Sequence, residues 1–260
     1  MQISLITVVR NRAHSIHRCL ESVASQRCKD FEHVIIDGAS TDGTVEIISQ
    51  YSKTRQNVVY ISEPDEGIYD AINKGLQIAQ GEIVGFLHSD DVFGAPDALA
   101  SVGRFLKNSE FDGCFGQCKY FISGDYDNCI REYKLHMPWE KYLKFGIIPP
   151  HSTLFLKQKK YKELGSYSRS YKIGGDFEFF CKMATHKVNL GYCSDLSVNM
   201  DYGGVSTMGS SYSVINKEIH RALKENNLMV SKYLIYLRYF KKIIELKPIN
   251  IIKKKMAKCM

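Results

Sequence analysis

An apolar run of strand length at residues 83–87 leads through His88 and Ser89 into two adjacent carboxylates, Asp90 and Asp91. Carboxylates at the carboxyl end of a buried strand lie where open α/β sheets bind ligands. Two neighbouring carboxylates repel each other unless a cation joins them. A hard divalent ion, Mg²⁺ or Mn²⁺, suits oxygen ligands and usually bridges to a substrate phosphate. The alternative is a helix N-cap, because Asp before a helix satisfies its first N–H groups.

Short apolar runs alternate with helical patterns through about residue 110. This order predicts an α/β fold with a doubly wound, mostly parallel sheet. The predicted strands are residues 3–9, 34–37, 58–61 and 83–87. Beyond residue 110 the alternation breaks, and the pattern predicts a hairpin around 123–128, a helix over 176–185, strands over 188–192 and 196–201, a flexible loop over 203–206 and a helix from about residue 210.

The composition is that of a globular protein, with 44% apolar and 24% charged residues. The eight cysteines are scattered without a zinc-site spacing, which favours reduced thiols in the cytosol. We expect neither a signal peptide nor a transmembrane helix, since the first strand starts at once and no run reaches about 20 apolar residues.

The positive charge is concentrated at the C-terminal end. The chain has a formal charge of +7, and residues 228–260 contain nine Lys or Arg and one Glu, which leaves residues 1–227 with about −1. We therefore predict a catalytic domain over residues 1–227 and a basic amphipathic helical tail over 228–260. Apolar and basic side chains on opposite faces suit a helix on an anionic membrane surface. The alternative is a helix that packs on the domain and exposes its lysines.

Parallel strands bring three polar strand ends to one edge of the sheet, namely residues 7–11, Asp37 and the Asp90–Asp91 pair. A nucleoside diphosphate fits that edge, because Asp37 could bind a base or ribose while a metal at Asp91 neutralises the diphosphate. Asp37 could instead cap the following turn. The Gly-rich turn at 38–43 is neither a P-loop nor a GxGxxG motif, which argues against ATPase and NAD chemistry. Arg10 and Lys74 could neutralise phosphate charge.

Several segments together resemble glycosyltransferase family 2, which has the GT-A fold. The similarity covers roughly residues 1–210 and rests on residues 7–11, 35–44, 71–75, 81–82 and 89–91. Residues 62–70 and 203–207 resemble more narrowly the bacterial O-antigen and colanic-acid type transferases. That resemblance implies a cytoplasmic enzyme on the inner face of the cell membrane, which extends an undecaprenyl-diphosphate-linked glycan of a lipopolysaccharide O-antigen or a similar polysaccharide.

The resemblance also implies roles for single residues. Thr7 and its neighbours Val9 and Arg10 would line the nucleoside pocket, and Asp37 and Asp65 would hold the nucleotide. Asp90 and Asp91 match the family's DxD-like site, with Asp91 the expected metal ligand. His88 stands where the family often has Asp or Asn, so this chain departs from a three-carboxylate site.

Asp176 aligns with the region of the family's catalytic base, and His151 resembles its acceptor-side histidine. An inverting transfer needs one carboxylate to take the proton of the acceptor hydroxyl. The leaving group is a metal-bound diphosphate and needs no protein acid. Asp176 follows two glycines at a predicted helix start and could instead be an N-cap, with Glu178 as the second candidate base.

These features predict an inverting transferase that uses Mn²⁺ or Mg²⁺ and moves Glc, Gal, GlcNAc or GalNAc from a UDP-sugar to a lipid-diphosphate-linked sugar. One alternative is a sugar nucleotidyltransferase, although such enzymes usually carry a Gly-rich loop after the first strand and residues 7–13 contain no Gly. Another is a non-catalytic protein with the basic tail as a nucleic-acid arm. The tail's aromatics fall at helical spacing and form no stacking platform, so we expect no nucleic-acid partner.

Overall fold

The computed structural model describes residues 2–122, 127–202, 211–228, 231 and 233–245. Its sheet has the strand order β3-β2-β1-β4-β8-β6-β9-β5, with β7 also paired to β6. The strands are β1 (Ile3–Val9), β2 (Phe31–Asp37), β3 (Val58–Ser62), β4 (Ile83–Phe86), β5 (Asp91–Phe93), β6 (Gly113–Phe121), β7 (Arg131–Tyr133), β8 (Phe155–Lys157) and β9 (Leu190–Asp201).

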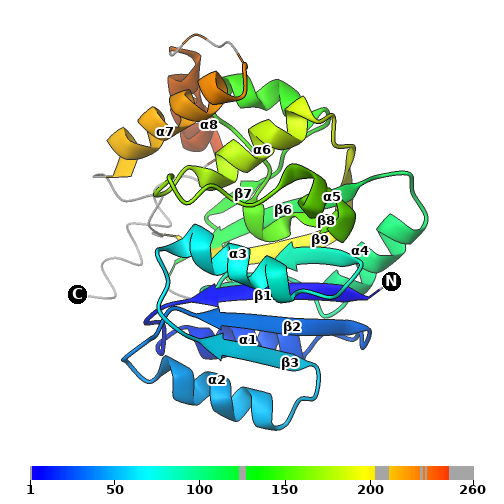
Figure 1. Cartoon of the computed structure of the whole chain (residues 1–260). Coiled ribbons are helices and arrows are strands. Elements are labelled where there is room, and N and C mark those ends of the chain that lie inside the picture. Colours follow the sequence, from blue (N-terminus) through cyan, green and yellow to red (C-terminus); the bar gives the residue numbers. More distant parts are fainter. Residues whose placement is uncertain (1, 123–126, 203–210, 229–230, 232, 246–260) are drawn as a thin grey trace.

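Helices cover both faces of this sheet (Figure 1). The α-helices are α1 (Ile16–Ala24), α2 (Thr44–Lys53), α3 (Ile68–Ile78), α4 (Ala98–Lys107), α5 (Gln158–Leu164), α6 (Gly175–Thr185), α7 (Ser211–Glu225) and α8 (Leu237–Glu245). Short 3₁₀ helices occupy Trp139–Phe145, His151–Thr153 and Leu234–Tyr236.

The first half of the sheet is parallel, as the alternating pattern predicts. β1 lies between β2 and β4, and β3 extends the sheet beyond β2, all in parallel register. The second half is mixed, because β8 is antiparallel to both β4 and β6, and β5 is antiparallel to β9. The predicted α/β class with helices on both faces is thus confirmed.

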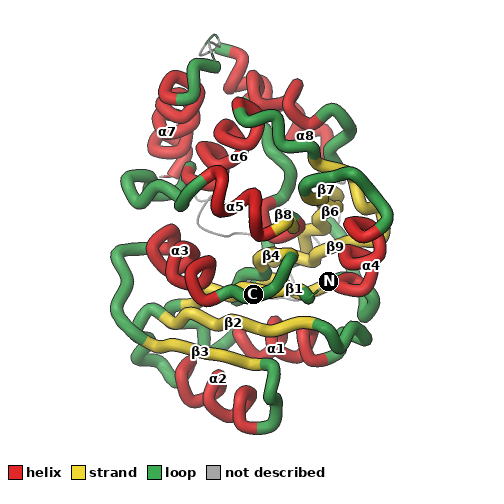
Figure 2. Tube along the Cα trace, turned by 45° about the vertical axis from the view of Figure 1, so that its right-hand side comes forward, coloured by secondary structure: helices red, strands yellow, loops and turns green. Residues whose placement is uncertain are grey.

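Each face of the sheet has its own apolar core. One core joins α1, α2 and α4 to one face of the sheet, and the other joins α3, α5 and α6 to the opposite face. Figure 2 shows α3 and α2 on opposite sides of the parallel strands. α7 and α8 lie together beyond α6, at the end of the molecule away from β3 (Figure 1). The carboxyl ends of β1 and β4 therefore face a region enclosed by α3, α6 and the C-terminal helices.

Some expected elements differ in detail. β4 ends at Phe86, and Asp91 opens the three-residue strand β5 instead of ending a strand. The two strands expected over 188–192 and 196–201 form the single strand β9, and its pairing with β6 has an irregularity between Phe115 and Gln117. β6 and β7 form the predicted hairpin. The expected loop at 203–206 lies outside the described residues.

α8 docks on the domain through its polar side. Arg131 of β7 donates two hydrogen bonds to Glu245 of α8, and Arg238 donates to Asn216 of α7. Tyr236, Leu237 and Phe240 remain exposed. Helix α8 thus packs on the domain while these three apolar side chains stay exposed. Within the described residues, no helix has the length and apolarity to cross a membrane.

The junction between β4 and β8 requires a residue without a side chain at position 85. A Cβ atom on Gly85 would lie 2.2 Å from the Phe155 ring, which is fully buried. We expect Gly85→Ala to lower the free energy of unfolding by about 1–3 kcal/mol through overpacking, measured by urea denaturation. Gly103→Ala in α4 is the control, because a Cβ atom on that glycine would have no neighbour within 4 Å. Equal stability of both variants would contradict this account.

Candidate active site

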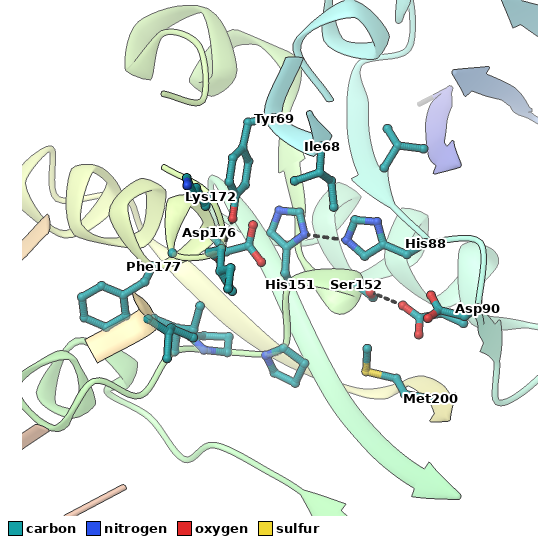
Figure 3. A pocket seen from close by; sticks show the side chains of 18 of the residues that line it. Ile68, Tyr69, His88, Asp90, His151, Ser152, Lys172, Asp176, Phe177 and Met200 are labelled. Atoms are coloured by element: carbon teal, nitrogen blue, oxygen red, sulfur yellow. Dashed lines mark hydrogen bonds between the residues drawn. The ribbon is translucent and has the colours of Figure 1, made fainter. Parts of the chain in front are cut away.

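A cavity of about 640 Å³ lies beyond the carboxyl ends of β1 and β4. Its wall includes the end of β1, the turn before β5, the start of α3, the start of α6, β7 and α8. Acidic and histidine side chains gather at one part of this wall (Figure 3). His88, Asp90, His151 and Asp176 are labelled there, and Asp65 and Asp91 also line the cavity.

The two adjacent carboxylates differ in exposure. Asp91 is 1% exposed and accepts a hydrogen bond from the Ser152 hydroxyl, whereas Asp90 is partly exposed. Burial, and next the charge of Asp90, raise the pKa of Asp91 well above its ordinary value. The two carboxylates therefore repel each other when both are charged, and a bound cation would offset that repulsion.

These residues fit a hard divalent cation as a partial ligand set. Among the described residues, no three or more His, Cys, Asp or Glu side chains gather closely enough to hold a metal by themselves. Two carboxylates with oxygen donors are what Mg²⁺ or Mn²⁺ takes from a protein when substrate phosphate and water complete its coordination. Asp90 is the more accessible of the two carboxylates, and Asp91 lies directly behind it.

His88 belongs to a hydrogen-bonded row of three side chains. Its Nε2 lies 3.3 Å from Nδ1 of His151, and His151 Nε2 lies 2.9 Å from the Tyr167 hydroxyl. Burial lowers the pKa of His151 to about 4, and burial together with His151 lowers the pKa of His88. Both rings are thus neutral at pH 7. Because both nitrogens of His151 have partners inside the protein, this residue fixes the orientation of His88.

Asp176 is the second residue of α6, and its carboxylate points into the cavity (Figure 3). The hydroxyl of Tyr69 donates to the Ile173 carbonyl at 2.7 Å and accepts the Gly175 N–H at 2.9 Å. A Cβ atom at Gly175 would lie 2.6 Å from the Tyr69 ring, so glycine permits this approach. Burial raises the pKa of Asp176 to about 6, against the opposing effects of His88 and of the Tyr69 hydroxyl.

A second carboxylate fixes the loop before α6. Glu218 of α7 accepts backbone N–H groups from Lys172, Ile173 and Gly174 at 2.7–3.0 Å. The first turn of α6 is therefore held from α3 on one side and from α7 on the other. Glu178, the second candidate base, is buried, pairs with Lys182 at 3.2 Å and does not line the cavity.

Four of the predicted nucleotide-sugar-binding residues line the cavity, namely Val9, Arg10, Asp65 and Asp90. Arg10 Nη1 lies 3.9 Å from Asp65 Oδ1, and a Cβ atom at Gly38 would lie 2.1 Å from the other Asp65 oxygen. Asp65 thus rests against the backbone of the turn that follows β2, where a glycine leaves room for it.

Thr7, Asp37 and Lys74 are not among the residues that line the cavity. The Thr7 hydroxyl donates to the Leu87 carbonyl at 2.8 Å inside the core. Asp37 is buried and accepts hydrogen bonds from Ser40 and Ser62, as a turn carboxylate does.

Lys74 Nζ lies 2.7 Å from Glu63 Oε1 and donates to the Pro64 carbonyl at 2.8 Å. Its ammonium group thus pairs with the loop before α3. The nucleotide-binding roles of Thr7, Asp37 and Lys74 remain predictions.

Sequence reasoning missed the residues that hold the site's side chains in place and those of β7 and α8 that line the cavity. Tyr69 lies within a segment that the family resemblance includes, but its role depends on a contact with residues more than 100 positions away. The missed residues are Tyr69, Arg131, Ser152, Tyr167, Glu218, Arg238 and Lys241. Most of them gain their role from packing between distant segments, which leaves no local pattern.

Comparison with known proteins agrees with this geometry. A curated PGL/p-HBAD biosynthesis glycosyltransferase from Mycobacterium bovis is 25% identical over 93% of this chain and 91% of its own length. An uncharacterized glycosyltransferase of Mycobacterium tuberculosis is 31% identical over 70% of this chain and 68% of its own. A poly(ribitol-phosphate) beta-glucosyltransferase of Bacillus spizizenii is 34% identical over 46% of this chain and 19% of its own.

Solved structures confirm the fold. S. aureus TarS 1-349 in complex with UDP-GlcNAc superposes with a TM-score of 0.69 at 20% identity, over 87% of this chain and 65% of that one. The mannosyltransferase PcManGT of Pyrobaculum calidifontis, in complex with GDP-Man and Mn²⁺, has a TM-score of 0.64 at 18% identity, over 91% and 68%. The chain spans 39% of a longer TarS structure.

The sheet order, with helices on both faces and a cavity at the strand ends, is therefore the GT-A arrangement. The model of the family described as "Glycosyl transferase family 2" matches residues 4–173, which span the parallel sheet, the Asp pair and His151. This match decides against the nucleotidyltransferase and non-catalytic alternatives, and the chain is a glycosyltransferase that belongs to glycosyltransferase family 2.

Proposed function

We propose that this enzyme moves a hexose or N-acetylhexosamine from a UDP-sugar, with inversion, to a hydroxyl of a lipid-diphosphate-linked glycan. One observation carries the proposal. The partly buried carboxylate of Asp176, with a pKa of about 6, shares a cavity with the Asp90–Asp91 pair. Such an arrangement separates a proton acceptor from a site for a diphosphate leaving group.

The reaction is one displacement. The acceptor oxygen bonds to the anomeric carbon as the bond from that carbon to the UDP oxygen breaks, and Asp176 takes the proton of the acceptor hydroxyl. A divalent cation at Asp90 and Asp91 would neutralise the leaving diphosphate. Tyr69 and Glu218 hold Asp176 in place by fixing the start of α6. Arg10 and Asp65 lie where they can hold the nucleotide.

A screen of donors tests the class of substrate directly. TarS has been solved with UDP-GlcNAc and PcManGT with GDP-Man, so the screen includes both nucleotides. UDP-Glc, UDP-Gal, UDP-GlcNAc, UDP-GalNAc and GDP-Man are each incubated with a GlcNAc-diphosphate-lipid acceptor and Mn²⁺. Product from one UDP-sugar supports the proposal, and product from GDP-Man alone contradicts it.

The role of Asp176 predicts a loss of rate and a pH dependence. Asp176→Asn removes the proton acceptor, so we expect kcat to fall roughly 10²- to 10⁴-fold while UDP affinity is retained. A carboxylate with a pKa of about 6 is protonated, and inactive as a base, at lower pH. Wild-type kcat/KM should therefore fall as the pH drops through about 6. The matched control is Glu178→Gln, and a comparable loss of rate in that variant would contradict the assignment.

The Asp pair predicts metal-dependent binding of the donor. We expect Asp90→Asn and Asp91→Asn each to weaken Mn²⁺-dependent UDP binding about tenfold or more, because each removes a charged oxygen ligand. Calorimetry with UDP, with and without Mn²⁺, measures this. Asp97→Asn is the control, since Asp97 pairs with Arg27 outside the cavity. Equal UDP binding with and without Mn²⁺ in the wild-type protein would refute a metal at this pair.

We also propose that the enzyme works on the cytoplasmic face of the cell membrane, in synthesis of an O-antigen or similar surface polysaccharide. Support comes from the exposed apolar side of α8 and the adjoining 3₁₀ helix, formed by Tyr236, Leu237 and Phe240. Basic residues beside such a surface favour contact with anionic lipid. Deletion of the whole tail would also remove cavity residues of α8, so point variants give the cleaner test.

The membrane proposal predicts a specific effect of two substitutions. Leu237→Ser together with Phe240→Ser should reduce sedimentation with anionic vesicles about tenfold, because two exposed apolar side chains no longer enter the lipid. Activity on a soluble acceptor should persist. Val59→Ser with Ile61→Ser on the edge strand β3 is the control, as these side chains are also exposed. Equal vesicle binding by both double variants would contradict contact through α8.

A further inference from the structure

The cavity has a second charged region, formed by β7 and α8. Arg131, Arg238 and Lys241 line this part of the wall, together with the rings of Tyr133 and Tyr239. Arg131 and Tyr133 of β7 lie within residues 4–173, which match the family model. Helix α8 lies wholly beyond that range. The acidic residues at the other part of the wall suit a metal and a nucleotide. The proposed reaction therefore assigns no role to Arg131, Arg238 or Lys241.

Strand register separates this region from the Asp pair. Asp91 stands opposite Met200 of β9, Met200 stands opposite Tyr120 of β6, and Tyr120 stands opposite Arg131 of β7. Three interstrand spacings amount to about 14 Å between the backbones of Asp91 and Arg131. A diphosphate bound at the Asp pair therefore leaves the cations of β7 and α8 available for another part of the substrate.

The region carries an excess of positive charge. Arg131 donates two hydrogen bonds to Glu245, at 2.9 and 2.6 Å, and Lys241 pairs with the other oxygen of the same carboxylate. Arg238 donates to the neutral Asn216 at 2.7 Å and lies against Tyr239. Glu245 thus pairs with two of the three cations, and Arg238 contacts a neutral amide and a ring.

The cations are also held in place. Lys241 Nζ and the Arg131 guanidinium lie 4.5 and 5.0 Å from the centroid of the Tyr133 ring, and the Tyr133 hydroxyl donates to the Ile148 carbonyl at 2.7 Å. Arg131 is 8% exposed. Fixed guanidinium and ammonium groups beside a cavity are the donors that proteins use for phosphate oxygens.

We infer that Arg131, Arg238 and Lys241 form a subsite for a phosphate or diphosphate group of the acceptor. This inference rests on the proposed transferase function and assigns the side chains that would bind the phosphate of its acceptor. Glu245 pairs with Arg131 and Lys241 and competes with the ligand for them. The subsite lies beside the exposed apolar side of α8, so an acceptor could place its phosphate in the cavity while its lipid remains in the membrane.

Kinetics with two acceptors tests the subsite. One acceptor is a GlcNAc-diphosphate-lipid, and the other is the uncharged GlcNAc glycoside of the same chain. We expect Arg238→Gln and Lys241→Gln each to raise KM for the diphosphate acceptor about tenfold, with kcat retained and KM for the donor unchanged. KM for the uncharged acceptor should not change. Equal effects on both acceptors, or an effect on donor KM alone, would overturn the inference.

Glu245→Gln should change KM for the diphosphate acceptor in the direction opposite to Arg238→Gln and Lys241→Gln. Removal of the competing carboxylate should lower KM for the diphosphate acceptor, whereas mere damage to the packing of α8 would raise it. Lys224→Gln on α7 is the matched control, because this lysine is exposed and does not line the cavity. It should leave all constants unchanged. A higher KM for the diphosphate acceptor in Glu245→Gln would contradict a competing role for this carboxylate and the subsite with it.

Binding of inorganic phosphate separates this inference from the transferase proposal. With EDTA present and no sugar nucleotide, the acidic part of the cavity repels anions, so phosphate should bind only at the cations. We expect calorimetric phosphate binding that is weakened about tenfold in Lys241→Gln, strengthened in Glu245→Gln and unchanged in Lys224→Gln. Phosphate binding that is the same in all variants would overturn the subsite even if transfer is observed.

Vesicle sedimentation distinguishes the source of the phosphate. If the subsite serves the acceptor, Lys241→Gln should bind anionic vesicles that lack acceptor as the wild type does. A loss of vesicle binding in Lys241→Gln, with KM for the soluble diphosphate acceptor unchanged, would assign the cations to lipid headgroups and overturn the inference.

Discussion

The hydroxyl of Tyr69 is the point at which the two halves of the site meet. It belongs to α3, which packs on the parallel half of the sheet, and it bonds both the carbonyl before α6 and the N–H of Gly175 within it. Asp176, the proposed catalytic base, is the next residue along the chain. The Tyr69 side chain therefore links the position of Asp176 to the parallel half of the sheet. Glu218 supports the same loop from α7, so α6 cannot shift without breaking contacts on both sides.

Burial gives the acidic residues of the cavity different properties. It raises the pKa of Asp176 to about 6, and such a group is ionised at pH 7 yet basic enough to take a proton. Burial and next the like charge of Asp90 raise the pKa of Asp91 well above its ordinary value. One carboxylate can therefore work as a free base, while the other two are most stable with a cation.

The sequence predicts the parallel half of the fold and the two acidic centres, because both leave local patterns. Four apolar runs separated by helical periods specify β1 to β4, and a carboxylate pair or a Gly-Gly-Asp segment is visible without any tertiary information. β5 and β8 are three residues long, too short for a periodic signal, so Asp91 opens a strand where a strand end was expected. The burial of Thr7 within the core could not be read from the sequence either, because it depends on the Leu87 carbonyl of a neighbouring segment.

The C-terminal helix shows why amphipathicity alone does not determine which side of a helix faces the protein. An apolar face usually packs inward, and a basic face usually meets water. In α8 the polar side instead meets Arg131, Asn216 and the cavity, since these groups offer ion pairs and hydrogen bonds that a helix in water would not gain. Leu237 and Phe240 of this helix remain exposed. A substrate with an uncharged chain and an anionic group matches this distribution, because the same helix presents apolar contacts outside the cavity and cations within it.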